Sequence, residues 1–286
     1  MSRPFAAAGV FVAGFLGLAA YASATPVSDA AAGLFAERIA LLAADQKCAL
    51  LAAPERAALA ATTTQARGAA ARDGWTDTRL DEVSARASVM GRARACNDGV
   101  LAQAAQSAKA GYLGWTKTFA IDLPGPTRAW RVRRTPDLEG WMLYQDVGAA
   151  RFGLRSVGDQ ATLQLSLPGA AAPVSAQVFV RDRSRAQRPF LDVPGLVPAS
   201  GLAAAAPPRA MATSWLASAI RIERIKDKPP RTLIVLPAQL FADMGRLDPR
   251  ESAEIVLTYS GGRSERYYIE IGDLAVAQAF LAAKPI

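Results

Sequence analysis

The chain contains no histidine, and this absence excludes several common catalytic designs. Ser-His-Asp and Cys-His catalysis, acid–base work by imidazole and the usual zinc ligand sets all require histidine. Cysteine is almost as scarce, since Cys48 and Cys96 are the only two and do not form a C-x-x-C motif. Neither standard glycine-rich phosphate loop is present. We therefore assign no catalytic residue, no metal site and no cofactor from the sequence.

Lysine is scarce as well, with 6 lysines and 27 arginines making up the 33 basic residues. The formal net charge is +8, but an arginine-rich, alanine-rich and lysine-poor composition often reflects a biased genome composition. We therefore expect no nucleic-acid partner, although the charge permits an anionic partner. Apolar residues make up 51% of the chain, which favours a folded protein over a disordered one.

The N-terminus lacks charge, because Arg3 is the only charged residue before Asp29. An apolar run covers residues 5–20, and Ala22-Ser23-Ala24 then forms an A-x-A cleavage pattern. These features are typical of a signal peptide over residues 1–24, so we predict export to the bacterial periplasm. The alternative is an uncleaved helix that anchors the protein in the inner membrane. No second long apolar run follows, so we expect no transmembrane segment after cleavage.

Export makes a disulfide between Cys48 and Cys96 the expected state of both cysteines, with two unpaired buried thiols as the alternative. Residues 25–118 are predicted to form a helical domain of about four antiparallel helices. Its two middle helices, one opened by Pro54 and one by a capping box at 78–81, have nearly equal lengths. Short links between antiparallel helices would therefore bring both cysteines to the same end of the bundle.

Residues 119–286 change to the two-residue periodicity of β-strands, as in residues 161–167 and in a hairpin turning at Gly261-Gly262. We predict an α+β fold, in which a mostly antiparallel β-sheet or β-sandwich domain with a C-terminal helix follows the helical bundle. Residues 192–212 contain four prolines and almost no charge. We predict a flexible Pro/Ala surface loop there, with a linker between two smaller β units as the alternative.

Two groups of arginines are candidates for binding an anion or a partner. Spacing of two residues places side chains on one face of a strand. Aligned guanidinium groups could hold phosphate or carboxylate groups, and the alternative is a solvated sheet edge. The candidates are Arg131, Arg133, Arg181, Arg183 and Arg185.

Carboxylates are the remaining route to hydrolysis, which needs two of them about 5–10 Å apart. The alternative is solvated surface charge. The acids that cluster in the last part of the sequence are Asp243, Asp248, Glu251, Glu265, Glu270 and Asp273.

The last third of the chain, around 233–245, 255–259 and 269–280, resembles the tail of the invasion-associated locus B family of exported proteins. Both have a strand, a short helix, a strand hairpin and a final helix after a glycine. The resemblance implies a noncatalytic periplasmic β-sandwich. The cysteines typical of that family's β domain are absent here.

These observations favour an exported, noncatalytic binding or accessory protein of the cell envelope. Its partner would be an anionic envelope polymer or another envelope protein. One alternative is a carboxylate-dependent hydrolase that acts on an envelope polymer. The other is a structural component of the envelope that binds only proteins.

Overall fold

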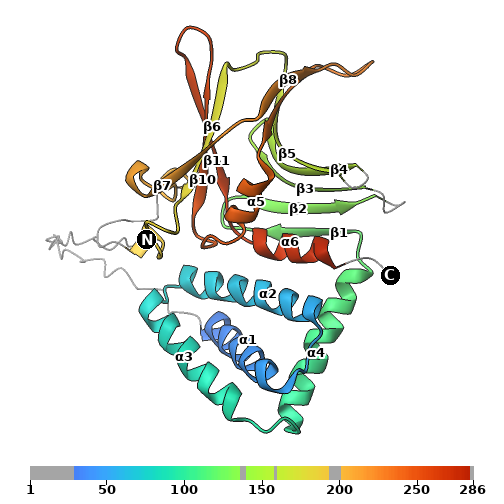
Figure 1. Cartoon of the computed structure of the whole chain (residues 1–286), viewed down its shortest axis with the longest axis vertical. Coiled ribbons are helices and arrows are strands. Elements are labelled where there is room, and N and C mark those ends of the chain that lie inside the picture. The colour runs from blue at the N-terminus through green and yellow to red at the C-terminus, as the bar shows by residue number, and fades with distance from the viewer. Residues whose placement is uncertain (1–28, 136–139, 158–159, 193–200, 284–286) are drawn as a thin grey trace, which may run out of the picture.

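The computed structural model describes residues 29–135, 140–157, 160–192 and 201–283. Four helices come first, and two antiparallel sheets with two further helices follow, so the predicted α+β fold is confirmed (Figure 1). The predicted signal peptide, residues 1–24, lies outside the described residues. Within the described ranges, no helix combines the length and the apolar character needed to cross a bilayer.

Two helices of the first domain begin at side-chain caps, because the first N–H groups of a helix need acceptors. The Thr76 side chain accepts from Arg79 N at 3.3 Å, so this helix begins two residues before the predicted capping box. Asp98 accepts from Leu101 N at 3.0 Å. The four helices are α1 (Asp29–Cys48), α2 (Ala53–Arg72), α3 (Asp77–Ala93) and α4 (Gly99–Thr116).

Helix α1 lies at the centre of the helical domain and packs closely against α2 and α3, while α4 touches α1 and α2 only in part (Figure 1). Alanines and glycines bring the helices close together, and a side chain at Gly91 would clash with the backbone of Ala40. The disulfide between Cys48 and Cys96 is present, with the two Cα atoms 5.5 Å apart. It joins the end of α1 to the segment before α4, as the predicted bundle required.

The β domain contains a seven-stranded sheet and a four-stranded sheet, both antiparallel. The first has the order β1 (Ala120–Pro124), β2 (Ala129–Arg134), β3 (Gly140–Val147), β4 (Ala150–Val157), β5 (Gln160–Pro168), β9 (Arg231–Leu236) and β8 (Ala219–Glu223). The second has the order β11 (Ser264–Glu270), β10 (Ser252–Thr258), β6 (Ser175–Arg181) and β7 (Ala212–Leu216). Because β7 leads through Ala217 and Ser218 into β8, one continuous stretch of chain borders both sheets.

One continuous apolar core joins the inner faces of both sheets with α5 (Ala238–Met244) and α6 (Leu274–Ala282). Trp130 lies fully buried in it, with its ring edge-on to Phe152 and Phe241 at centroid distances of 6.2 and 6.1 Å. The indole N–H of Trp130 donates to the carbonyls of Glu270 and Ile271 at 3.0 and 2.9 Å. This side chain therefore ties β2 to the end of β11 and satisfies its one polar group.

The two domains meet where α2 packs against α6, which itself lies beside β2 (Figure 1). A network of largely buried ion pairs extends this contact: Arg250 lies 3.0 Å from both Asp77 and Asp248, and Arg67 lies 2.5 Å from Asp77. Gly68 leaves room for Pro249, whose side chain would lie 2.8 Å from an added Cβ. Helix α2 therefore belongs to the packing of both domains.

The Pro/Ala segment 192–212 lies in part outside the described residues, at 193–200. Its second half is tied to the four-stranded sheet, since Ser252 N donates to the Ala205 carbonyl at 3.0 Å and Arg209 pairs with Glu254 at 2.6 Å. The segment connects β6 and β7, which are neighbours in one sheet, so it does not link two separate β units. Its flexibility stays a prediction.

Candidate functional site

Arg181, which the sequence suggested as a surface anion ligand, is instead buried at the end of β6. Its Nε and Nη2 atoms donate to the two carboxylate oxygens of Glu251 at 2.6 and 2.9 Å, and both side chains are almost fully buried. Nη1 donates to the carbonyls of Ala186 and Gln187. The guanidinium therefore holds the following loop against the turn before β10.

Arg183 and Arg185 do not share a strand face with Arg181, so the predicted arginine stripe is wrong. The strand ends at Arg181, and the chain turns at Asp182, whose side chain accepts from Ser184 N at 2.9 Å. An aspartate that accepts from the second following N–H favours a turn over an extended strand. Arg185 pairs with Asp182 at 3.2 Å. Anion binding by these two residues stays a prediction that nothing in the structure tests.

Arg131 and Arg133 lie on one face of β2, as their spacing predicted. The residues that alternate with them, Trp130, Val132 and Arg134, point to the buried side. In the register of the sheet, Arg131 lies opposite Tyr144 and Arg133 opposite Met142. Directly opposed residues of an antiparallel pair share a face, so both arginines lie on the solvent-facing side of the seven-stranded sheet.

These two arginines are partly neutralised where they lie. Arg133 pairs with Asp122 of β1 at 2.5 Å, and Arg131 pairs with Asp146 of β3. Asp146 also accepts from Arg151 at 2.9 Å. Each of these side chains is about one-third exposed or more, so the ion pairs contribute little to stability. An external anion could therefore replace the aspartates as partners of the arginines.

A hollow of about 510 Å³ lies on the same face, across β3, β4, β5 and β9, and we call it the sheet hollow. Arg151, Arg155 and Arg231 line it together with Tyr144. The guanidinium carbon of Arg151 lies 4.1 Å from the centroid of the Tyr144 ring, and Gly153 leaves the floor of the hollow without a side chain. Among the residues that the structure describes, neither Arg155 nor Arg231 has a carboxylate within ion-pair distance.

The arginine face, defined as Arg131, Arg133, Arg151, Arg155 and Arg231, carries an excess of positive charge. Five arginines face Asp122 and Asp146, which leaves a net charge of +3 on these seven residues. At the sheet edge, Glu223 lies opposite Arg231, and Arg221 of the same strand balances its charge. Asp146 lines the sheet hollow as well, but a concave surface with an excess of one sign of charge concentrates ligands of the opposite sign.

The six clustered acids do not gather at one site, and none of them lines the sheet hollow or the hollow described below. Asp248 and Glu251 are held by arginines, and Glu265 accepts from Tyr259 at 3.0 Å. Asp243 accepts from Gln239 on the surface of α5. Within the described ranges, no three Asp, Glu or Cys side chains are placed to hold a metal ion.

The two remaining acids, Glu270 and Asp273, are buried near the contact between the domains. Glu270 accepts from the backbone N–H groups of Thr127 and Arg128 at 3.1 and 2.7 Å. Asp273 accepts from Gln65 of α2 at 2.6 Å. Burial raises the pKa of both carboxyl groups, although these hydrogen bonds act in the opposite direction. The crevice beside Asp273 has no room for a water-sized ligand. We therefore assign both acids a structural role, in which they accept hydrogen bonds from neighbouring segments.

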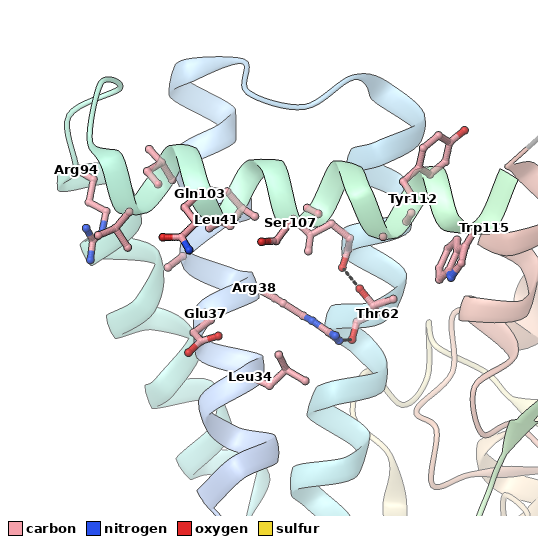
Figure 2. A pocket seen from close by; sticks show the side chains of 18 residues that line it. Leu34, Glu37, Arg38, Leu41, Thr62, Arg94, Gln103, Ser107, Tyr112 and Trp115 are labelled. Atoms are coloured by element: carbon pink, nitrogen blue, oxygen red, sulfur yellow. Dashed lines mark hydrogen bonds between the residues drawn. The ribbon is translucent and has the colours of Figure 1, made fainter. Parts of the chain in front are cut away.

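A second and larger hollow, of about 920 Å³, lies in the helical domain, and we call it the helical hollow. Figure 2 shows α4 crossing above α1 and α2, with Arg38 reaching from α1 toward Thr62 on α2. The walls are mainly apolar and include Leu34, Leu41 and Val100. The hollow exists because α4 diverges from the tightly packed pair of α1 and α2.

Sequence reasoning missed Arg151, Arg155 and Tyr144 as members of the sheet site. The alternation Arg151-Gly153-Arg155 in a predicted strand carried the same signal as Arg131 and Arg133. The helical hollow had no sequence signal, because it arises from the angle at which α4 crosses its neighbours.

Comparison with known proteins finds no matching family model, no similar curated protein and no similar solved structure. The resemblance of the last third to the invasion-associated locus B family therefore goes no further than the shared order of elements. That order, β9, α5, β10, β11 and α6, is present in the structure. Any function for this chain has to be argued from its own surface.

Proposed function

We propose that this protein is an exported binding or accessory protein of the bacterial cell envelope, and that the arginine face binds an anionic envelope polymer. The observation that carries the proposal is the sheet hollow, in which Arg155 and Arg231 are exposed and have no carboxylate partner among the described residues. The disulfide and the signal-like N-terminus support export to an oxidising compartment.

The chemistry of the arginine face suits repeated phosphate or carboxylate groups. A guanidinium group presents several N–H donors in a planar fork, which matches the geometry of both anions. The arginines of the face come from β2, β4 and β9, so their charges are spread over the width of the sheet. A polymer that carries several anionic groups can contact several of these arginines at once, whereas a single small anion cannot.

The proposal is tested by retention of the mature full-length protein on immobilised lipopolysaccharide and on purified peptidoglycan. The double substitution Arg155→Gln/Arg231→Gln removes the two arginines that lack partners and leaves the paired ones in place. We expect its retention on one of these polymers to fall by about tenfold at low salt, since each lost charge-assisted hydrogen bond is worth about 1 kcal/mol or more. The difference should shrink as salt rises, because exposed charges are screened within about 8 Å at physiological ionic strength.

The matched control is Arg86→Gln/Arg92→Gln, which removes the same charge from exposed positions on α3, away from both hollows. Its retention should equal that of the unsubstituted protein if the location of the arginines matters more than the net charge of the protein. Equal loss in both double variants would show non-specific attraction to a basic protein. No retention of the unsubstituted protein on either polymer would contradict the proposal.

A further inference from the structure

The helical hollow has the size and lining of a site for a small hydrophobic ligand. Its volume of about 920 Å³ lies at the upper end of the range of about 300–1,000 Å³ that is typical of ligand pockets. Its lining runs along α4 from Val100 to Trp115, which corresponds to about 22 Å at 1.5 Å per residue. The site is therefore long, and it suits a chain-like ligand better than a compact one.

Packed side chains border part of the helical hollow. Near the disulfide, Leu41, Leu59 and Leu101 form an apolar cluster. At the other end, Trp115 packs edge-on against Phe280 of α6 with the ring centroids 6.0 Å apart. The open side is bordered by apolar side chains, since Leu34 and Val100 are 41% and 64% exposed. An unoccupied groove of this kind leaves apolar area in water, which binding of a hydrocarbon would remove.

Arg38 places one cationic group halfway along this apolar groove. The side chain is half-buried and donates to the Thr62 carbonyl, and it has no carboxylate within ion-pair distance among the described residues. Its neighbour Glu37 also borders the groove but is exposed, and Arg94 at the end is paired with Asp98 at 2.9 Å. Burial lowers the pKa of Arg38, which shows that its charge is poorly solvated where it lies, and the nearby Glu37 offsets this in part. A guanidinium group has five N–H donors, so several remain for an anion.

We infer that the helical hollow binds a free long-chain fatty acid, with its carboxylate on Arg38 and its alkyl chain along the apolar wall of α4. The charge of Arg38 selects an anionic head group, and the elongated shape suits a single chain. This inference does not rest on the proposed function of the arginine face, because the two sites share no residue.

The test is isothermal titration of the mature full-length protein with palmitate, at concentrations below those at which it forms micelles. We expect one palmitate per chain. Arg38→Gln should weaken binding by about tenfold or more, the loss of one charge-assisted hydrogen bond, and Arg38→Lys should restore part of it. Ser107→Trp adds a large side chain from α4 into the groove at a position outside the packed core, and it should abolish binding.

Two control variants separate this site from general effects. Arg86→Gln removes an exposed charge from α3, and Ala110→Trp adds the same ring to an exposed position of α4 outside the groove. Both should bind palmitate as the unsubstituted protein does, and so should Arg155→Gln/Arg231→Gln. Hexadecyltrimethylammonium, a cation with the same chain length, should bind much more weakly than palmitate.

Three results would overturn the inference. They are absence of palmitate binding, equal binding of the cationic amphiphile, and unchanged affinity in both Arg38→Gln and Ser107→Trp. Circular dichroism of each variant shows whether its helices are intact, so a loss of binding through unfolding is recognised directly. Failure here would leave the polymer-retention experiment unaffected.

Discussion

The helical domain and the β domain are stabilised in different ways. The β domain has one continuous core that contains large, fully buried side chains such as Trp130, Phe152 and Phe280. The helical domain has two small separate clusters built mainly from alanine and leucine, and one of its four helices is held partly by a disulfide. A domain that buries little apolar surface gains proportionally more from a covalent link.

This difference in packing explains where the two candidate sites lie. In the β domain, close packing confines the candidate site to the solvent-facing side of the sheet. In the helical domain, α4 makes fewer contacts with α1 and α2 than α1 makes with α2, and the helical hollow lies between these helices. The disulfide therefore stabilises a helix that packing alone holds weakly.

Trp130→Ala should cause the largest loss of stability among these variants, and it tests how far the β domain depends on its core. It removes a ring packed between Phe152 and Phe241, and large-to-small changes of this kind cost about 3–5 kcal/mol of unfolding free energy. Hydrogen exchange measured by region should show faster exchange in β2, β3 and β11 than in α1 and α3. Equal acceleration in both domains would mean that they unfold as one unit.

Arg181→Met should be nearly as harmful, because it leaves the buried Glu251 carboxylate without its partner, at a cost of about 3–5 kcal/mol. The double variant Arg181→Met/Glu251→Met removes both charges, and we expect it to be more stable than the single variant. Urea denaturation of the two variants measures the difference. A double variant that is less stable than the single one would contradict this account of the pair.

Removal of the disulfide should affect the helical domain selectively. The closed loop spans 48 residues, so its loss should cost on the order of 4 kcal/mol at most. Cys48→Ser, Cys96→Ser and the double variant should lose equal stability, since each removes the same bond. Thermal unfolding gives the size of the loss, and hydrogen exchange should locate it in α1 and α4. Faster hydrogen exchange in the β-strands as well would contradict a stabilising effect confined to the helical domain.

Asp273→Asn should cause the smallest change in stability. Asp273 lies at the contact between the two domains. Burial raises the pKa of Asp273, so the folded state binds the proton more tightly than the unfolded state. Stability from this group is therefore fully present below the unfolded value of about 4 and is lost as pH rises through the folded value. Asparagine cannot ionise, so the variant should gain on the order of 1 kcal/mol or less at neutral pH. Denaturation at pH 4 and pH 7 checks whether the difference appears only at the higher pH.

The sequence predicted the order and type of most elements because their signals are local. Pro54 opens a helix, Asp98 caps one, and the alternation in 161–167 indicates a strand, all without reference to distant residues. The disulfide was also predictable, since it followed from the expected compartment and the expected helix lengths.

The candidate sites were less predictable, because they depend on which elements become neighbours. Arg181 looked like a surface residue until β6 was placed beside Glu251, 70 residues away in the sequence. The sheet hollow requires the pairing of β5 with β9, which are separated in the sequence by β6, β7 and β8. Strand order of this kind follows from tertiary packing. The alternation of residues within a single strand carries no information about which strand becomes its neighbour.

The shared role of α2 has a consequence for the order in which the chain becomes structured. Gln65 and Asp273, whose side chains join α2 to the start of α6, are separated by 208 residues. During synthesis the N-terminal helices are complete long before α6 is available. The face of α2 that finally meets α6 is thus exposed for most of that time, and the last helix of the chain covers it only at the end. A chain truncated before α6 would leave this face of α2 exposed to solvent.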